Sequence, residues 1–310
     1  MSFIKSYFLE TSLKTFLTKT FLDFCVIIFK FFNCFISMPE LPEVETVRLA
    51  LSDHFLKCKI CKIVINTKKL RFFIPLNFSK NFTGKKINLI SRHGKYIIIN
   101  FSSQNSLLVH LGMTGIFRIS NSYTKKKHDH IIFYFEKKVL VYNDVRKFGF
   151  FKTYKLGEVN SSKHIVKLGI DPLDKNFNIN YFRKFFKDKK INIKSFLMNQ
   201  ENISGLGNIY CSEILFDCNI SPLRCISFLK ELEKKKLIFS IKRILSKAIK
   251  KGGTSLKDFF SPDGDIGYFK NELKVYGREK KDCLNCGKNS KVKKVKQQGR
   301  STFFCSKCQV

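Results

Sequence analysis

Two pairs of cysteines close to the C-terminus constrain the fold of this chain more than any other feature. Cys283 and Cys286 form one Cys-x2-Cys pair, and Cys305 and Cys308 form the second. Two such pairs at this separation are typical of four thiolates that hold one zinc ion in a closed, structural site. Since the segment has almost no apolar core, the metal would supply most of its folding free energy, on the order of 10 kcal/mol or more. We therefore expect residues 275–310 to form a zinc finger with one structural Zn²⁺.

The remaining cysteines form no regular disulfide framework. The chain of 310 residues contains eleven cysteines, an odd number, and this usage is typical of a reducing compartment. Cys58 and Cys61 form a further Cys-x2-Cys pair that lacks a second pair. We interpret these two residues as strand cysteines, with a metal site as the alternative.

The formal net charge is +34, from 58 basic and 24 acidic residues. The usual causes of such a charge are a polyanionic partner or an anionic membrane surface. An AT-rich coding sequence is the alternative, because phenylalanine is abundant and tryptophan is absent. Six basic residues lie between the two cysteine pairs, where they either contact phosphates or form a solvated face: Lys288, Lys291, Lys293, Lys294, Lys296 and Arg300.

Short segments rich in β-branched and aromatic residues follow the first 55 residues. No helical pattern alternates with them, so an antiparallel sandwich or barrel is favoured over a parallel sheet. The expected strands cover residues 60–65, 87–90, 96–101, 107–111, 116–119, 131–135, 139–142 and 148–154.

The pattern changes near residues 168–173, which we interpret as a hinge between domains. Gly252 and Gly253 suit a left-handed cap at the end of a helix. The segment 205–208, Gly-Leu-Gly-Asn, opens a helix whose first N–H groups suit a phosphate, with a simple tight turn as the alternative. Apolar residues at three- and four-residue spacing predict helices over residues 182–187, 193–198, 208–217 and 228–250. The chain is therefore expected to be an α+β protein.

The stretch that begins at Met38 predicts another helix. Pro42 suits the first helical position, and Glu43 provides the negative charge that is favoured in the first turn. Apolar residues then recur at helical spacing: Val44, Val47, Leu51 and Phe55. A helix does not require Pro39 and Glu40. They make chemical sense if Met38 is the true first residue, because its removal leaves a free proline amine beside a carboxylate.

Residues 1–37 contain an apolar run that is similar to a leader or a membrane anchor. Asp23, Lys30 and Asn33 interrupt it, so it falls short of a clean span. No small-x-small cleavage site precedes Met38. We interpret the segment as a non-homologous extension from a start codon assigned too far upstream; a removed leader and a retained anchor are the alternatives.

Three motifs closely resemble those of bacterial formamidopyrimidine-DNA glycosylase and occur in the same order. They are residues 39–45 (Pro-Glu-Leu-Pro-Glu-Val-Glu), 205–210 (Gly-Leu-Gly-Asn-Ile-Tyr) and 299–305 (Gly-Arg-Ser-Thr-Phe-Phe-Cys). The resemblance covers residues 39–310, which is nearly the whole chain after Met38.

This resemblance implies a catalytic β-sandwich over residues 38–168, a helix–two-turns–helix domain over residues 169–274 and the zinc finger over residues 275–310. It implies base excision repair of double-stranded DNA: removal of oxidised purines such as 8-oxoguanine and formamidopyrimidines, followed by β- and δ-elimination. We expect a monomer that is cytoplasmic and associated with the bacterial nucleoid, with no membrane partner once residues 1–37 are absent.

The implied chemistry fits the residues. An α-amine has a pKa near 8, so part of it is neutral at pH 7, and attack by the secondary amine of Pro39 on the sugar gives an iminium directly. By resemblance, Glu40 donates a proton at the sugar ring. Glu43 would lie one helical turn away, and we expect it to help position the amine. Lys95 contacts the phosphate beside the lesion and assists β-elimination. Arg300 binds the phosphates that flank the lesion and is assigned to δ-elimination. The alternative is that the two glutamates are only acids of a helix start.

By resemblance, Asn208, Lys190 and His128 hold the DNA backbone. His128 and His130 would face one side of a strand, which raises a metal site as the alternative. The segment 253–259 is similar to the loop that closes on the flipped base.

An enzyme that acts on a base must take it out of the stack, and the family fills the gap with residues that match Met113, Arg146 and Phe148. A flexible apolar wedge and an aromatic ring replace lost stacking, and the arginine pairs with the orphaned base. The alternative places Met113 and Phe148 in the core.

Val145 and Lys147 stand where proline and arginine are common in the family, and the stretch between Cys286 and Arg300 is longer than usual. Two alternative functions remain. The nearest is an endonuclease VIII-like glycosylase for oxidised pyrimidines, although Leu41-Pro42 favours the purine enzyme. The second is a non-catalytic, zinc-dependent DNA-binding protein. If residues 1–37 stay attached, Pro39 has an amide nitrogen and no nucleophile.

Overall fold

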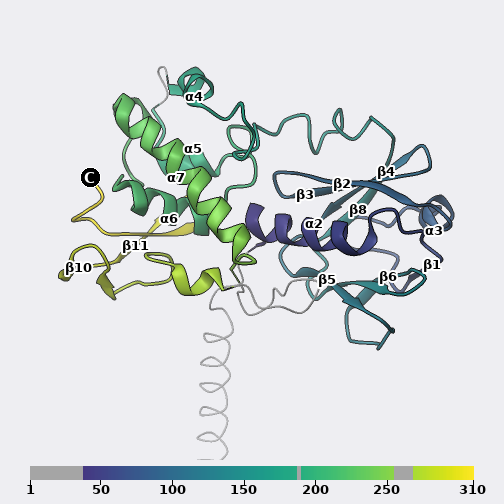
Figure 1. Cartoon of the computed structure of the whole chain (residues 1–310). Helices are drawn as coiled ribbons and strands as arrows, with labels where there is room; N and C mark the ends of the chain where they lie inside the picture. Colours follow the sequence, from purple (N-terminus) through teal and green to yellow (C-terminus); the bar gives the residue numbers. More distant parts are fainter. Residues whose placement is uncertain (1–37, 187–189, 255–267) are drawn as a thin grey trace, which may run out of the picture. The chain divides into compact units, whose positions relative to one another are not determined.

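The computed structural model describes residues 38–186, 190–254 and 268–310 (Figure 1). Within these ranges an antiparallel β-sandwich is followed by a helical region and by two small C-terminal hairpins, which confirms the predicted α+β class. Residues 1–37, and residues 255–259 of the predicted closing loop, lie outside the described residues. No helix in the described ranges is long and apolar enough to cross a membrane.

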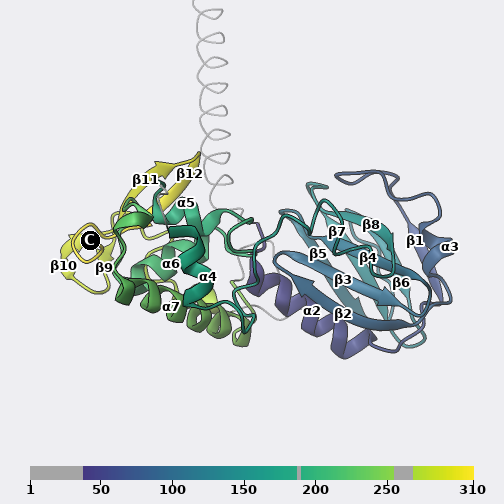
Figure 2. The ribbon, with the colours of Figure 1, turned by 90° about the horizontal axis from the view of Figure 1, so that it is seen from above.

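Helix α2 (Leu41–Phe55) packs its apolar face against β2 and β3 of the sandwich (Figure 2). Its predicted apolar positions are buried, and each such side chain contributes roughly 1.5–3 kcal/mol of burial free energy. The helix begins at Leu41, one residue before the predicted start at Pro42. The reason is the cap, because the backbone N–H of Glu40 donates to Oε2 of Glu43 at 3.0 Å.

The sandwich consists of two four-stranded antiparallel sheets, with orders β1-β6-β7-β5 and β2-β3-β4-β8. All eight predicted strands are present. Their bounds are β1 Lys62–Ile65, β2 Ile87–His93, β3 Tyr96–Phe101, β4 Asn105–His110, β5 Gly115–Ser120, β6 Asp129–Tyr134, β7 Val139–Asp144 and β8 Phe150–Lys155.

Two features of the sandwich differ from the sequence prediction. Strand β8 begins at Phe150, not Phe148, because Lys147 adopts a left-handed conformation (φ 55°) that ends the preceding turn. A short helix, α3 (Phe78–Phe82), was not predicted. Its five residues are too few for a helical period, although Phe78 and Phe82 are fully buried in the core.

The helical region contains α4 (Ile179–Phe186), α5 (Ile193–Met198), α6 (Asn208–Cys218) and α7 (Glu231–Lys250), with 3₁₀ turns η1 (Ile226–Phe228) and η2 (Phe269–Glu272). Helix α6 is buried along almost its whole length and packs against α5 and α7. The left-handed cap predicted after α7 is confirmed. Gly252 and Gly253 have φ of 72° and 79°, and the N–H of Gly253 donates to the carbonyl of Ala248 at 2.8 Å.

The C-terminal region pairs β9 (Asp282–Cys283) with β10 (Gly287–Lys291) and β11 (Lys293–Gln297) with β12 (Arg300–Phe304). Glu213 of α6 anchors its start, because its carboxylate accepts backbone N–H groups from Lys274, Val275 and Tyr276 at 2.8, 3.0 and 2.8 Å. Phe303 packs against Phe216 of α6 in the small core beneath the hairpins.

Candidate active site

Glu40 brings the N-terminal motif into contact with the glycine turn at the start of α6. Its Oε1 accepts the N–H of Ile209 at 2.9 Å, and its Oε2 accepts the N–H of Tyr210 at 3.4 Å. A Cβ at Gly207 would lie 2.3 Å from Cδ of Glu40, so glycine leaves the space for the carboxylate. The N–H groups that we had considered for a phosphate therefore bind a carboxylate of the same chain.

Glu43 ties the start of α2 to the segment after α7. Its Oε1 accepts hydrogen bonds of 2.8 Å from the hydroxyl of Tyr210 and from both the N–H and the hydroxyl of Thr254. Its Oε2 accepts the N–H of Glu40. Both glutamates are buried. The alternative that they are only acids of a helix start is therefore too narrow. They hold residues 38–43 against the start of α6 and against the segment after α7.

Lys95 lies in the tight turn between β2 and β3, directly beside these acids. Gly94 permits the turn with φ of 55°, and a Cβ there would lie 2.9 Å from Cβ of Ser204. Lys95 is 7 % exposed. Burial lowers its pKa, the carboxylate of Glu40 raises it and the guanidinium of Arg300 lowers it. The structure thus brings both Glu40 and Arg300 within electrostatic range of Lys95, and Pro39 is buried next to Glu40 in the chain.

The carboxyl group of Glu40 has an unusual pKa. Burial raises it from 4.5 to about 7, although the ammonium of Lys95 lowers it. Removing a charge from water is costly, so burial favours the neutral acid. A large fraction of Glu40 therefore holds a proton near neutral pH.

Arg92 holds the Lys95 turn in place, a role that no local pattern in the sequence predicts. Its guanidinium donates to Oε2 of Glu45 at 2.6 Å, to the carbonyl of Gly94 at 2.9 Å and to the carboxylate of Asp171. Asp171 belongs to the segment that we predicted as a hinge. One cation therefore connects α2, the Lys95 turn and the hinge segment.

Lys194 is a second residue that sequence reasoning missed. It is 1 % exposed, and its ammonium donates to Oδ1 of Asn208 and Oγ1 of Thr302, both at 2.6 Å. Nδ2 of Asn208 donates to the carbonyl of Ser301 at 2.9 Å. The only signal in the sequence was a lysine within the apolar face of a short helix. The predicted Lys190 lies exposed before α5.

Met113, Arg146 and Phe148 line one pocket of ≈ 610 Å³ together with Met38. Met113 is half-buried and Phe148 is 44 % exposed, so the interpretation of Phe148 as a core residue is wrong. The guanidinium of Arg146 lies 4.7 Å from the centre of the Phe148 ring. The three predicted residues are therefore brought together beside the residue that precedes Pro39.

A fully buried aspartate, Asp144, connects the two loops that carry these residues. It accepts hydrogen bonds from the hydroxyl of Thr114 at 2.6 Å and from the N–H groups of Gly149 at 2.8 Å and Arg146 at 3.2 Å. Thr114 follows Met113, and Gly149 follows Phe148. The Asp144 carboxylate thus fixes the Met113 turn relative to the Arg146–Phe148 turn.

The two histidines considered as metal ligands have separate surroundings. His128 is half-buried and precedes β6 with φ of 70°, whereas Nε2 of the buried His130 lies 2.8 Å from the carbonyl of Asp144. In the part of the chain that the structure describes, the four C-terminal cysteines are the only group of three or more potential ligands. The metal alternatives at His128/His130 and at Cys58/Cys61 therefore find no support.

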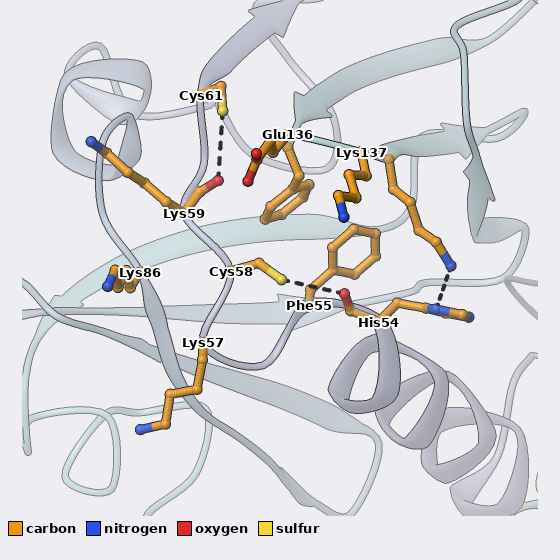
Figure 3. Close-up of a pocket in the computed structure, with 11 residues that line it drawn as sticks. His54, Phe55, Lys57, Cys58, Lys59, Cys61, Lys86, Glu136 and Lys137 are labelled. Atoms are coloured by element: carbon orange, nitrogen blue, oxygen red, sulfur yellow. Dashed lines mark hydrogen bonds between the residues drawn. The ribbon is translucent and has the colours of Figure 1, made fainter.

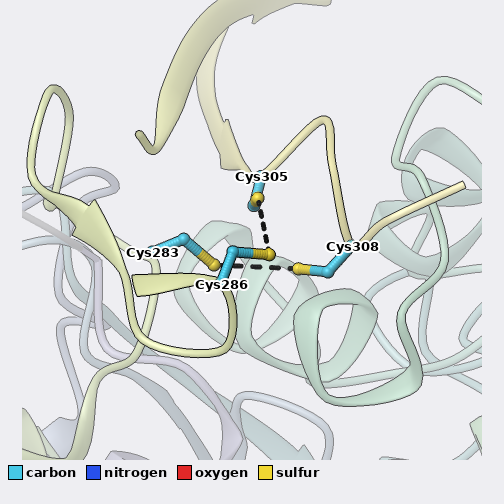
Figure 4. Close-up of side chains that lie close together, drawn as sticks. All are labelled: Cys283, Cys286, Cys305 and Cys308. Atoms are coloured by element: carbon cyan, nitrogen blue, oxygen red, sulfur yellow. Dashed lines mark hydrogen bonds between the residues drawn. The ribbon is translucent and has the colours of Figure 1, made fainter. Parts of the chain in front are cut away.

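The four predicted cysteines form a metal-binding cluster (Figure 4). All four sulfurs lie within 4.8 Å of one another, with Sγ–Sγ distances of 3.7 Å between Cys283 and Cys308 and 3.9 Å between Cys286 and Cys305. A tetrahedron with Zn–S distances of about 2.3 Å has edges of about 3.8 Å. The donor set and its size therefore fit a zinc ion.

Comparisons with known proteins agree with this geometry. The family model of the formamidopyrimidine-DNA glycosylase N-terminal domain matches residues 38–151, and that of the H2TH domain of the same glycosylase matches residues 168–260. The chain is 43 % identical over 274 residues to the formamidopyrimidine-DNA glycosylase of Wolbachia pipientis, with 88 % of this chain and all of the relative covered. The relative from Aliivibrio fischeri is 43 % identical, with 88 % and 98 % covered.

Solved structures give the same result. The Lactococcus lactis FPG mutant in complex with DNA containing Fapy-dG has a TM-score of 0.81 and 37 % identity, with 87 % of this chain and 99 % of that chain covered. A MutM complex with DNA containing carbocyclic 8-oxo-G has a TM-score of 0.79 and 36 % identity, with the same shares covered.

The fold and the site thus define a DNA glycosylase of base excision repair with an H2TH domain. The chain belongs to the formamidopyrimidine-DNA glycosylase family.

Proposed function

We propose that this chain, when it begins at Pro39, is a bifunctional glycosylase and AP lyase that removes oxidised purines from double-stranded DNA. The observation that supports this most is that Lys95 lies within electrostatic range of both Arg300 and Glu40, the residue that follows Pro39. Such a cluster supplies an acid and two cations beside a potential amine nucleophile.

In the proposed reaction the neutral amine of Pro39 attacks C1′ of the sugar. The base leaves with the electron pair of the broken bond and takes up the proton that the amine loses. Glu40 donates a proton to the ring oxygen, which opens the sugar and leaves an iminium between Pro39 and C1′. A pKa of about 7 suits this role, because the acid is still partly protonated at the pH of the cell.

The iminium acidifies the C2′–H bond. Loss of this proton expels the 3′ phosphate by β-elimination, and a second elimination expels the 5′ phosphate. Lys95 and Arg300 are proposed to bind these phosphates and to stabilise the charge that develops on them.

We propose that Asn208, Lys190 and His128 bind the DNA backbone, and that Met113, Arg146 and Phe148 fill the gap left by the flipped base. The shared pocket of these last three residues supports this. The four cysteines would hold a structural Zn²⁺, whose role is to fix the hairpin that carries Arg300. We propose further that the protein acts as a monomer in the bacterial cytoplasm, at the nucleoid.

The choice of oxidised purines rests on relatives. Solved structures similar to this chain are described as complexes with Fapy-dG and with carbocyclic 8-oxo-G, although one Lactococcus lactis complex contains an oxidised pyrimidine. An endonuclease VIII-like preference for pyrimidines is therefore the second candidate. Excision of 8-oxoguanine and of thymine glycol from otherwise identical duplexes distinguishes them, and faster excision of the glycol would contradict our proposal.

Borohydride trapping tests the covalent step. A chain that begins at Pro39 should form a trapped adduct with DNA that contains 8-oxoguanine. The 310-residue chain should form none, because its Pro39 nitrogen is an amide. Adduct formation by the longer chain, or no adduct from the shorter one despite lesion binding, would overturn the assignment; the second result would favour the non-catalytic DNA-binding protein.

A further inference from the structure

A second pocket lies at the end of α2 that is remote from Glu40 (Figure 3). Its volume is ≈ 510 Å³, within the range of roughly 300–1,000 Å³ that is typical of ligand sites. Three segments and Lys86, which precedes β2, form it. The segments are the C-terminal end of α2, residues 57–61 (here called the strap), and the turn between β6 and β7. This pocket shares no lining residue with the pocket of Met113 and Phe148.

The strap connects the two sheets of the sandwich, so the wall of the pocket is fixed on both sides. The N–H of Ile87 in β2 donates to the carbonyl of Cys58 at 3.0 Å, and the N–H of Cys61 donates to the carbonyl of Tyr134 in β6 at 2.7 Å. The pocket is therefore a built feature of the sandwich edge and not a gap between mobile side chains.

The pocket combines an apolar base with a cationic rim. The rings of Phe55 and Phe135 meet at its base with centroids 4.2 Å apart. Five of its eleven lining residues are lysines, and one, Glu136, is an acid. Basic residues are therefore more frequent here than in the whole chain, where lysine and arginine together make up 58 of 310 residues. The five lysines are Lys57, Lys59, Lys86, Lys137 and Lys138.

We propose that this pocket docks an acidic peptide segment of a partner protein, which inserts one bulky apolar side chain above Phe55 and Phe135 and pairs its flanking carboxylates with the lysine rim. Charge complementarity favours an acidic ligand, and the pocket requires an apolar group to fill it. Duplex DNA meets only the first requirement, because its phosphates lie on a convex surface and it presents no side chain to enter the pocket.

The peptide can be bound while DNA occupies the active site. Helix α2 has 15 residues, so at 1.5 Å per residue it separates the pocket from Glu40 by roughly 22 Å. The inference does not depend on the chemistry of Pro39, since it concerns the opposite end of the sandwich. With this pocket, the protein would be a glycosylase with a separate site that recruits a partner protein.

Fluorescence anisotropy with the full 310-residue chain tests the proposal. The probe is a labelled synthetic peptide with one phenylalanine between two runs of three aspartates. Binding should weaken at least about tenfold when the phenylalanine is replaced by alanine or the aspartates by asparagine. The double variant K59E/K137E should lose binding by a similar factor. The matched control K235E/K236E makes the same change of charge on exposed positions of α7 and should change the affinity less than about twofold.

Thiol labelling supplies an independent measurement. The peptide should slow alkylation of Cys58 and Cys61, which line the pocket, and leave Cys225 of the helical region unaffected. Equal binding by K59E/K137E and the control, or no protection of Cys58, would overturn the proposal. Displacement of the peptide from the strap by lesion-free duplex would assign the pocket to nucleic acid instead and would also overturn it.

Discussion

The carboxylate of Glu40 accepts the backbone N–H of Ile209 at 2.9 Å, although 169 residues separate the two in the chain. This bond places an acid of the N-terminal motif on the first turn of α6. The β-sandwich and the helical region therefore share one buried acid. The position of residue 39 depends on both.

Glu40 should make the stability of the protein depend on pH. Its pKa is 4.5 when it is solvated and about 7 in the folded chain. Between these values the folded chain holds a proton that the unfolded chain has lost, so the free energy of unfolding falls as pH rises, by about 3 kcal/mol in total. The stabilisation is complete below pH 4.5 and is lost above about 7. Urea denaturation from pH 4.5 to 8 should show this fall, and Glu40→Gln should lack it.

Glu136→Gln is the matched control for this measurement, because Glu136 is exposed. It should retain the fall in stability that the unmodified chain shows. Parallel pH profiles for the unmodified chain and Glu40→Gln would contradict the raised pKa.

Lys194 should have the opposite dependence at alkaline pH. Burial lowers its pKa from 10.5 to about 8. Between these values the unfolded chain holds the extra proton, so the free energy of unfolding should rise with pH from 8 to 10.5, by about 3 kcal/mol. Lys194→Met should lack this rise and should be less stable by about 1–3 kcal/mol at pH 7, because Asn208 and Thr302 lose a buried donor.

A second measurement separates positioning by Lys194 from stability alone. Lys194→Met should weaken δ-elimination more than base release, because Lys194 holds Thr302 and Ser301, which follow Arg300 in β12. Lys190→Met, four residues earlier and exposed, should leave the ratio of the two products unchanged. An equal loss of both steps in Lys194→Met would mean that Lys194 acts only through stability.

Local patterns were enough to predict most of the fold. Short segments rich in β-branched and aromatic residues located the eight strands, and apolar spacing located α5 and α6 because those faces are buried. The misses have local causes. Helix α3 is shorter than two turns, and Phe148 lies in a turn fixed by Asp144 rather than in β8.

The candidate site was only partly predictable, because charged residues take their roles from distant neighbours. Motifs identified Glu40, Lys95 and Asn208. No local pattern distinguishes the buried Lys194 from a solvated lysine, since its partner Thr302 is 108 residues away. The role of Arg92 is equally hidden from local patterns, because its partner Asp171 is 79 residues away in the chain.

Asp144 should control the loops that are proposed to fill the DNA gap. Asp144→Asn keeps the shape but replaces one acceptor oxygen by a donor among the N–H groups of Arg146 and Gly149. We expect a loss of about 1–3 kcal/mol in unfolding free energy. We also expect a smaller fluorescence rise from 2-aminopurine placed beside the lesion. Thr114→Val removes one donor to the same carboxylate and should have a weaker effect on both. Unchanged fluorescence in Asp144→Asn would show that the loops do not need this anchor.

Metal removal should separate the C-terminal hairpins from the rest of the fold. The four cysteines lie outside the two larger cores, which the sandwich and the helices bury on their own. Cys308→Ser should therefore lose the metal. Elemental analysis should find one equivalent of zinc in the unmodified chain and none in this variant. It should lose affinity for lesion DNA at least about tenfold, because Arg300 leaves its place beside Lys95.

The β-sheet signal in circular dichroism should stay largely intact in Cys308→Ser, since the eight strands of the sandwich carry none of the four cysteines. Cys58→Ser is the control, because Cys58 lies in the strap and not in the cluster; it should keep both metal and affinity. A Cys308→Ser protein that binds lesion DNA normally would show that the hairpin holds Arg300 in place without its metal. In that case the Lys194–Asn208–Thr302 hydrogen bonds, and not the zinc, would be the main anchor of Arg300.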